Sequence, residues 1–210
     1  MCGQEVHALT RPEGQDDALA ASGQAANVTE PVEEGVPIAE LLRLAESVHR
    51  SLEDYIAKHS QDGESKAKAL NLIKWLNKKI KLVEREESFV VPPLYEIRVK
   101  RGYVWWMEFG FNIGYEFGGR HPGVILQRSS GIVWAIPVSS QRPTPEQMRQ
   151  GIYVEIPVIK GRFEDIPRWV NVLTLMPVSE IRIDFSSASG YVSGSVLDQI
   201  REAMERRYPR

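Results

Sequence analysis

The sequence is poor in cysteine and histidine, and this scarcity excludes several kinds of chemistry. Its 210 residues include one cysteine, Cys2, and four histidines. A single cysteine forms neither a disulfide within the chain nor a thiolate metal cluster, and it suits a reducing cytoplasm. The histidines form no convincing metal-ligand cluster, and none follows His121 to complete a Ser–His–Asp hydrolase. We therefore expect a protein that works without a metal ion.

Long apolar runs and nucleotide-binding motifs are absent as well. No apolar run approaches the ~18 residues needed to span a bilayer. The N-terminus lacks the basic and then apolar pattern of a secretory signal. Neither a phosphate-binding loop motif nor a dinucleotide fingerprint occurs. These absences predict a soluble, cytoplasmic protein with no membrane partner and no cofactor.

Charge is divided unevenly along the chain, although the whole chain carries a net charge of only −2. Residues 1–95 hold 11 Lys and Arg against 16 Asp and Glu, a net charge of −5. After residue 95, 15 Lys and Arg stand against 12 Asp and Glu, which gives this part a net charge of +3. Such asymmetry suggests an anionic partner for the second half. Chance segregation of solvated charges explains it equally well.

Three segments differ in composition. Residues 1–36 are acidic and poor in aromatics, so we expect them to be disordered. Residues 37–90 repeat apolar side chains at intervals of three and four, interrupted by a turn at Gly63. This pattern predicts a helical hairpin whose apolar seams pack together. Residues 91–210 form the third segment, a separate β-rich domain.

The second predicted helix also carries a basic face. We favour a solvated surface for this face, and a stripe that contacts phosphates is the alternative. Its members are Lys66, Lys68, Lys74, Lys78, Lys79 and Lys81.

The remainder of the chain reads as short strands separated by Gly and Pro turns. We predict a mainly β (α+β) fold, a small SH3-like barrel closed by a C-terminal helix that Ser195 caps. The predicted strands are Val99–Phe109, Gly123–Gln127, Ile132–Val138, Ile152–Val158, Val170–Met176 and Ile181–Phe185.

Polar residues cluster at the predicted rim of this barrel. One strand begins just after Arg120 and His121, and the next ends at Ser139, Ser140 and Gln141. If the two strands are neighbours, an arginine and two hydroxyls come together, which is a combination that binds phosphate. Strand-end capping by serine is the alternative.

The segment from Val99 to Leu126 resembles the opening of the PemK/MazF family of type II toxin–antitoxin endoribonucleases. The match starts with Arg101-Gly102-Tyr103-Val104-Trp105 and continues with Gly114, Glu116, Arg120 and Pro122, with His121 before the proline. Pro137-Val138-Ser139-Ser140 and the later segments Val154–Pro157 and Val178–Ile183 also resemble the family. The resemblance extends from about Tyr95 to Tyr208.

The resemblance implies a metal-independent, sequence-selective endoribonuclease that cleaves single-stranded mRNA. In such a reaction the RNA 2′-hydroxyl attacks the adjacent phosphorus, leaving a 2′,3′-cyclic phosphate and a 5′-hydroxyl. The catalytic pair implied is Arg120 and Ser139. A homodimer in the cytoplasm and a cognate antitoxin protein are implied as well. The expected substrate-binding residues are Glu116, Gly119, His121, Ser140, Gln141, Tyr115 and Phe117.

One departure from the family keeps alternatives open. Met176 stands where relatives carry an arginine on a late strand. A non-catalytic barrel that binds a protein target such as gyrase, or a regulatory protein that binds nucleic acid, therefore remains an alternative. The N-terminal hairpin, which minimal relatives lack, has three alternative roles: pairing with a second copy, binding RNA, or masking the cleft.

Overall fold

The computed structural model describes residues 35–207. The predicted disordered segment 1–36 therefore lies outside the described residues, apart from its last two. Within residues 35–207, no helix combines the length and the apolar character required to cross a membrane.

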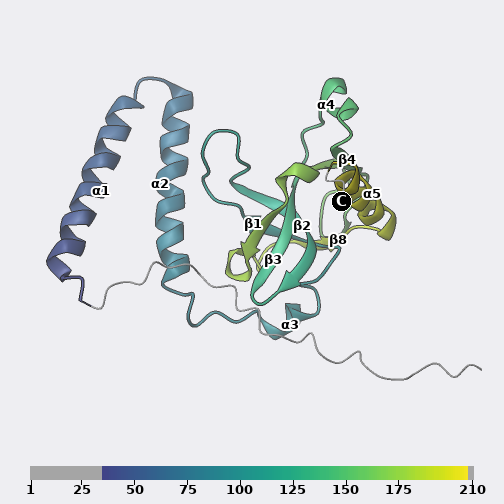
Figure 1. The fold of residues 1–210 in the computed structure, drawn as a ribbon, viewed down its shortest axis with the longest axis horizontal. Helices are drawn as coiled ribbons and strands as arrows, with labels where there is room; N and C mark the ends of the chain where they lie inside the picture. The colour runs from purple at the N-terminus through teal and green to yellow at the C-terminus, as the bar shows by residue number, and fades with distance from the viewer. Residues whose placement is uncertain (1–34, 208–210) are drawn as a thin grey trace, which may run out of the picture. The chain divides into compact units, whose positions relative to one another are not determined.

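Two helices of 21 residues each open the described chain, as predicted (Figure 1). Helix α1 spans Ile38–Lys58 and α2 spans Gly63–Val83. The carboxylate of Asp62 accepts a hydrogen bond of 2.8 Å from the backbone N–H of Ser65 and so caps α2. The turn predicted at Gly63 is therefore the N-terminus of the second helix.

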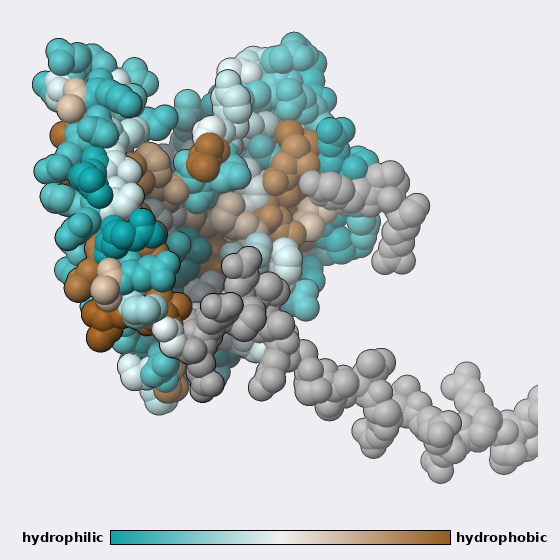
Figure 2. All heavy atoms as spheres, turned by 60° about the vertical axis from the view of Figure 1, so that its left-hand side comes forward, coloured by the Kyte–Doolittle hydropathy of each residue, from teal (hydrophilic) through white to brown (hydrophobic). Residues whose placement is uncertain are grey.

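The predicted packing of the two helices along their apolar seams is only partly formed. Helix α1 buries none of its residues, although Leu52 and Tyr55 are half-buried. Ile38, Leu41 and Leu42 remain 75%, 55% and 61% exposed. Apolar side chains accordingly appear as brown patches on a mainly hydrophilic face (Figure 2).

The remaining chain forms a curled antiparallel sheet with a C-terminal helix, which confirms the predicted fold class (Figure 1). Within the described residues the strand order is β4-β6-β3-β2-β1-β8-β5, and β7 pairs with β3. The strands are β1 (Tyr103–Glu108), β2 (Arg120–Ser129), β3 (Ile132–Ser139), β4 (Tyr153–Ile156), β5 (Lys160–Gly161), β6 (Arg168–Asn171), β7 (Met176–Ser179) and β8 (Ser189–Tyr191). The helices of this part are α3 (Pro93–Glu96), α4 (Pro145–Arg149) and α5 (Gly194–Arg207).

The sheet is buried on both faces. Val104, Val124 and Ile136 lie side by side on β1, β2 and β3 and share a core with α5. The neighbouring residues Trp105 and Ile125 project to the other face and enter a second core. Because both faces are covered, the polar side chains that remain accessible lie mainly at the strand ends.

The segment before β1 belongs to this second core. Val91 and Val99 are buried there. The Tyr95 ring lies 5.4 Å from that of Trp105 and 5.7 Å from that of Phe185. The linker between the hairpin and the sheet is thus packed against the domain.

The prediction of a single strand over Val170–Met176 is wrong. Strand β6 ends at Asn171, whose side-chain oxygen accepts a hydrogen bond of 3.0 Å from the backbone of Leu173. This local bond favours a 3₁₀ turn over Val172–Thr174, after which β7 begins at Met176.

The strand predicted over Ile181–Phe185 and the predicted Ser195 cap are also wrong. A 3₁₀ turn occupies Glu180–Arg182, and Glu180 is buried there in an ion pair with Arg128. Helix α5 begins at Gly194, two residues earlier than a Ser195 cap predicts, and the Ser193 hydroxyl accepts a hydrogen bond of 3.3 Å from the backbone N–H of Val196.

Candidate functional site

The loop between β1 and β2 is pinched at its base. The backbone N–H of Gly119 donates to the carbonyl of Gly110 at 2.5 Å, and the N–H of Phe109 donates to the carbonyl of Gly119 at 2.8 Å. A Cβ on Gly118 would stand 2.7 Å from the Gly110 oxygen. Only glycine at position 118 permits this close approach, and it is what holds the two strand ends together.

Polar side chains brace the loop from inside. The amide of Asn112 donates to the carbonyl of Phe117 at 2.5 Å, and the carboxylate of Glu116 accepts from the backbone N–H of Ile113 at 3.3 Å. Glu116 therefore fixes the loop itself. The loop leads directly into Arg120, the first residue of β2.

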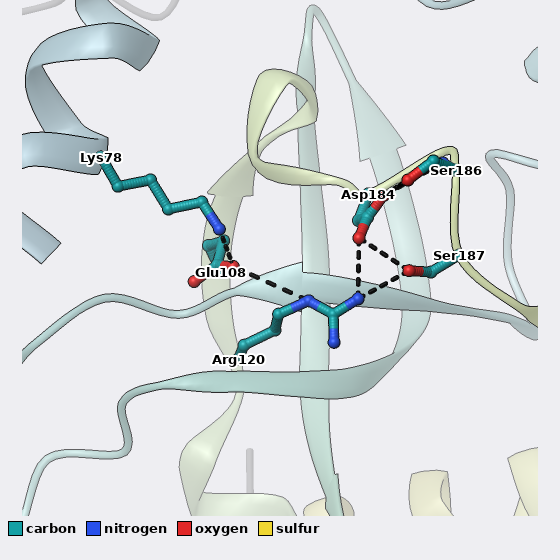
Figure 3. Close-up of polar contacts among 6 residues, drawn as sticks. All are labelled: Lys78, Glu108, Arg120, Asp184, Ser186 and Ser187. Atoms are coloured by element: carbon teal, nitrogen blue, oxygen red, sulfur yellow. Dashed lines mark hydrogen bonds and ion pairs between the residues drawn. The ribbon is translucent and has the colours of Figure 1, made fainter. Parts of the chain in front are cut away.

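Arg120 lies in a ring of polar partners (Figure 3). Its Nη2 donates to Asp184 at 2.7 Å and to the Ser187 hydroxyl at 2.6 Å. Its Nε lies 3.8 Å from a carboxylate oxygen of Glu108. The guanidinium also stands 4.6 Å from the ring centre of Trp106. These contacts fix the plane of the guanidinium.

Asp184 is the anion that holds Arg120 most directly. Burial raises the pKa of Asp184, but hydrogen bonds from Ser186, Arg120 and Ser187 outweigh this effect and hold that pKa well below its usual range. The carboxylate is therefore charged at any pH near neutrality. It is a permanent anchor for Arg120.

Glu108 joins Arg120 to the N-terminal hairpin (Figure 3). The Glu108 side chain is 11% exposed, and it contacts both Lys78 of α2 and Arg120. Glu108 and Asp184 together balance the charges of Lys78 and Arg120. A ligand at this site therefore meets directed donors rather than a strong excess of positive charge.

The Nη1 nitrogen of Arg120 has no polar partner among the described residues. Nε and Nη2 point at protein oxygens, whereas no hydrogen bond or ion pair engages Nη1 among residues 35–207 (Figure 3). The Arg120 side chain is 40% exposed. A guanidinium fixed on one side and open on the other presents an oriented N–H donor to an anion such as a phosphate oxygen.

His121 is held under the loop. Its ring meets the Phe117 ring edge to face, with 4.8 Å between centroids, and Phe117 packs in the same way on Phe109. On the β1 side its partner in the ladder is Met107. Burial lowers the pKa of His121, so the ring is neutral at pH 7.

Ser139, Ser140 and Gln141 end β3. The Ser139 hydroxyl accepts a hydrogen bond of 3.0 Å from the backbone N–H of Gln141, which is the strand-end cap that the sequence allowed. Ser140 and Gln141 are exposed. Within residues 35–207 the Ser139 hydroxyl donates no hydrogen bond, so its proton is available to a ligand.

The sheet register decides which of these residues share a face. The β2–β3 ladder ends at the pair Gly123–Pro137, and His121 and Ser139 lie two positions further along their strands. Because residues two apart on a strand share a face, His121 and Ser139 project to the same side. Arg120 projects to the other side, and no contact joins it to Ser139 within the described residues.

The exposed aromatics separate into two groups. Tyr115 at the loop tip is fully exposed, and so is free to stack on a ligand. Phe117 is already packed between Phe109 and His121.

Gly119 adopts φ of 86°, a conformation that favours glycine, and lies against the His121 ring.

The sequence did not reveal three polar partners of Arg120, nor Lys78, which contacts one of them. Asp184 and Ser187 are more than 60 positions away in the chain, and they reach Arg120 only through the turn after the 3₁₀ segment. The succession Asp-Phe-Ser-Ser is a turn signal, but it names no distant partner. Nothing in the sequence marks Glu108 or Lys78 as members of the site.

Among residues 35–207, no group of three or more His, Cys, Asp or Glu side chains is arranged to hold a metal.

Together, the curled antiparallel sheet, the terminal helix and the arginine at the loop-to-strand junction define a small-barrel class of protein. Residues 100–206 match the family described as the PemK-like, MazF-like toxin of type II toxin–antitoxin systems. The chain belongs to this family. Its members include the MazF endoribonuclease toxins.

Solved structures give distant similarities. The chain is 20% identical to MazF from Deinococcus radiodurans, covering 57% of this chain and 97% of that one, with a TM-score of 0.41. It is 18% identical to a mycobacterial endoribonuclease solved in complex with its cognate antitoxin, covering 51% and 91%, with a TM-score of 0.35. It is 14% identical to the Mycobacterium tuberculosis toxin MazF-mt6, covering 50% and 94%, with a TM-score of 0.38. No curated protein matches the chain.

Proposed function

We propose that this protein is a metal-independent, sequence-selective endoribonuclease that cleaves single-stranded mRNA. The 2′-hydroxyl of the substrate attacks the adjacent phosphorus, the bond to the 5′-oxygen breaks, and the products carry a 2′,3′-cyclic phosphate and a 5′-hydroxyl. The observation that carries the proposal is the guanidinium of Arg120, which is fixed by Asp184 and Ser187 and open at Nη1.

Arg120 stabilises the charge that develops on the phosphoryl oxygens. Because the nucleophile belongs to the substrate, the protein has to orient the reacting groups and stabilise this charge. A guanidinium whose plane is already fixed does this without reorganising at the moment of reaction. Asp184, Ser187 and Glu108 are positioning residues, since they act through Arg120.

Ser139 and His121 project to the opposite side of the strand ends from Arg120, so the RNA has to pass over this edge of the sheet to meet all three side chains. The Ser139 hydroxyl donates to a non-bridging phosphate oxygen. His121 is neutral near pH 7, so its ring is able to accept the proton of the attacking 2′-hydroxyl. Tyr115, Ser140 and Gln141 lie exposed around this end of the sheet and contact the flanking nucleotides.

The proposal includes the partners that the resemblance implies. The protein acts in the cytoplasm as a homodimer, and a cognate antitoxin protein binds it. One solved endoribonuclease from a mycobacterium is in complex with its cognate antitoxin, which supports this part of the proposal.

The test is cleavage of a mixed-sequence single-stranded RNA by the full chain in EDTA, with analysis of the product ends. Arg120→Ala, Ser139→Ala and His121→Ala are compared with Arg149→Ala. Arg149 is a matched control, because it is an exposed arginine whose ion pair, among the described residues, is with Glu146 of its own helix α4. Loss of one preorganised donor is expected to lower the rate by about 10²–10³.

Cyclic-phosphate and 5′-hydroxyl ends, with cleavage lost in Arg120→Ala and kept in Arg149→Ala, are the expected result. Cleavage that persists in Arg120→Ala would refute the assigned role of Arg120. Absence of cleavage of any tested RNA by the unmodified protein would refute the enzymatic proposal.

A second candidate is a non-catalytic module that binds a protein or a nucleic acid. The observation that favours it is Met176, which is half-buried, packs on the second core and supplies no polar group where relatives carry an arginine. Salt-sensitive RNA binding without turnover would support this candidate.

A further inference from the structure

A pocket lies where helix α2 meets the loop between β1 and β2. Its volume is about 580 Å³, within the range of about 300–1,000 Å³ that small-ligand sites occupy. From α2 it is lined by Asn71, Lys74, Trp75 and Lys78. From the sheet domain it is lined by the loop and by Arg120. The pocket therefore shares Arg120 and Glu108 with the candidate site.

Two contacts hold α2 against this pocket. The Lys78 ammonium contacts Glu108, the buried carboxylate that also faces Arg120 (Figure 3). The Trp75 ring stands 5.2 Å from the guanidinium of Arg182. A Cβ on Gly110 would come within 3.3 Å of Cζ2 of the same ring, so the loop backbone lies close to the edge of the indole. The pocket thus has fixed walls on both sides.

The lining suits an unpaired nucleotide. Lys74, Lys78 and Arg120 supply cationic donors, and Asn71 supplies an amide. The acids of the lining are Glu108, which contacts both Lys78 and Arg120, and Glu116, which accepts from the loop backbone. The half-exposed indole of Trp75 offers a surface for stacking a base.

We propose that this pocket binds a nucleotide of single-stranded RNA that flanks the scissile phosphate, so that helix α2 is part of the substrate site. The inference rests on the proposed function. Lys74 contacts the phosphate of this flanking nucleotide. On the basic face of α2, the lysines that line the pocket therefore bind RNA, and the others are solvated. Lys79 of the same face does not line the pocket.

An RNA-binding role fits better than a masking role. A helix that masked the site would fill the cleft beside Arg120, whereas α2 leaves about 580 Å³ open there. Arg120 also keeps 40% of its side chain exposed in the presence of the helix. Helix α2 therefore borders the entrance without closing it.

The test uses the full chain and a short, fluorescently labelled single-stranded RNA carrying 2′-O-methyl groups, which lacks the attacking hydroxyl. Lys74→Gln is compared with Lys79→Gln, and Lys74→Arg restores the charge. One lost phosphate contact is expected to lower the slope of log affinity against log salt by about 0.7, which weakens binding about fourfold at 0.15 M salt. In cleavage assays KM rises by the same factor and kcat is unchanged.

Binding weakened in Lys74→Gln, normal in Lys79→Gln and restored in Lys74→Arg would support the inference. If the protein binds in this way but cleaves no RNA, the proposed catalysis fails and the pocket assignment stands. Equal effects of Lys74→Gln and Lys79→Gln would overturn the inference, because they would indicate nonspecific electrostatic attraction between the RNA and the basic face of α2. Faster cleavage in Lys74→Gln would overturn it as well, because α2 would then be a mask.

Discussion

Replacing Asp184 by asparagine tests the network around Arg120. The substitution keeps the shape of the side chain and removes its charge. The hydrogen bond of 2.7 Å from Arg120 then becomes a weaker one to a neutral oxygen. Hydrogen bonds to charged groups contribute about 1.5–3 kcal/mol, and neutral ones about 1 kcal/mol. Because both side chains are partly exposed, we expect a loss of stability of about 1 kcal/mol at pH 7.

The sign of the pH dependence follows from the depressed pKa of Asp184. A carboxyl whose folded pKa lies below its unfolded value stabilises the protein above the unfolded pKa of about 3.9, and this stabilisation is lost as the pH falls toward the folded pKa. At pH 3 an unfolded aspartate is already largely protonated, so most of this contribution of about 1 kcal/mol is lost. The difference between the unmodified protein and Asp184→Asn should therefore nearly vanish at pH 3.

Urea unfolding of both proteins at pH 7 and pH 3 measures this difference. Other carboxyl groups titrate over the same range, but they do so in both proteins and cancel in the comparison. A gap that is the same at both pH values would show that the charge of Asp184 contributes nothing, and would refute the reasoning. Equal stability at pH 7 would refute the contact with Arg120 itself.

Three further substitutions test other parts of the structure. His121→Phe should abolish the loss of stability that His121 causes as the pH falls below about 6.5, because the unfolded imidazole then binds a proton that the buried one resists; unfolding from pH 5 to 8 checks this. Gly118→Ala should lower the melting temperature, because the new Cβ would stand 2.7 Å from the oxygen of Gly110. Glu180→Gln should destabilise the fold by about 2 kcal/mol in urea unfolding, because it leaves Arg128 without its buried partner.

One of these predictions has a matched control variant, and each has an outcome that would contradict it. Gly63→Ala serves as the control for Gly118→Ala, because nothing lies within 4 Å of the added Cβ. Equal melting temperatures of the two alanine variants would contradict the packing argument. An unchanged pH profile in His121→Phe, or a Glu180→Gln variant as stable as the unmodified protein, would contradict the burial of those groups.

Local sequence patterns predicted much of the fold. The apolar spacing gave both helices of the hairpin, and alternation gave the strands now seen as β1 to β4, with ends shifted by a few residues. Patterns failed where a side chain changed the local backbone. The side chain of Asn171 ends a strand and starts a 3₁₀ turn, and no alternation of apolar residues records that.

The candidate site was predicted only in part, because its contacts are long-range. The motif around Arg120 located the strand end, and antiparallel pairing then placed the end of β3 beside the start of β2. The identity of the side chains facing Arg120 depended on a turn more than 60 residues later. The pairing register of β2 and β3 decides whether Arg120 or His121 shares a face with Ser139. The sequence does not define this register to within one residue, and a shift of one residue exchanges the two faces.

The aromatic packing of the linker has a consequence for the order of events during synthesis. Tyr95 leaves the ribosome 90 residues before Phe185, its partner in the second core. At synthesis rates of about 5–20 residues per second, the linker aromatics stay without that partner for about 5–20 s. The turn that carries Asp184 and Ser187 arrives at the same late moment. A nascent chain therefore acquires an oriented Arg120 only after the turn with Asp184 and Ser187 has been made, more than 60 residues after Arg120 itself.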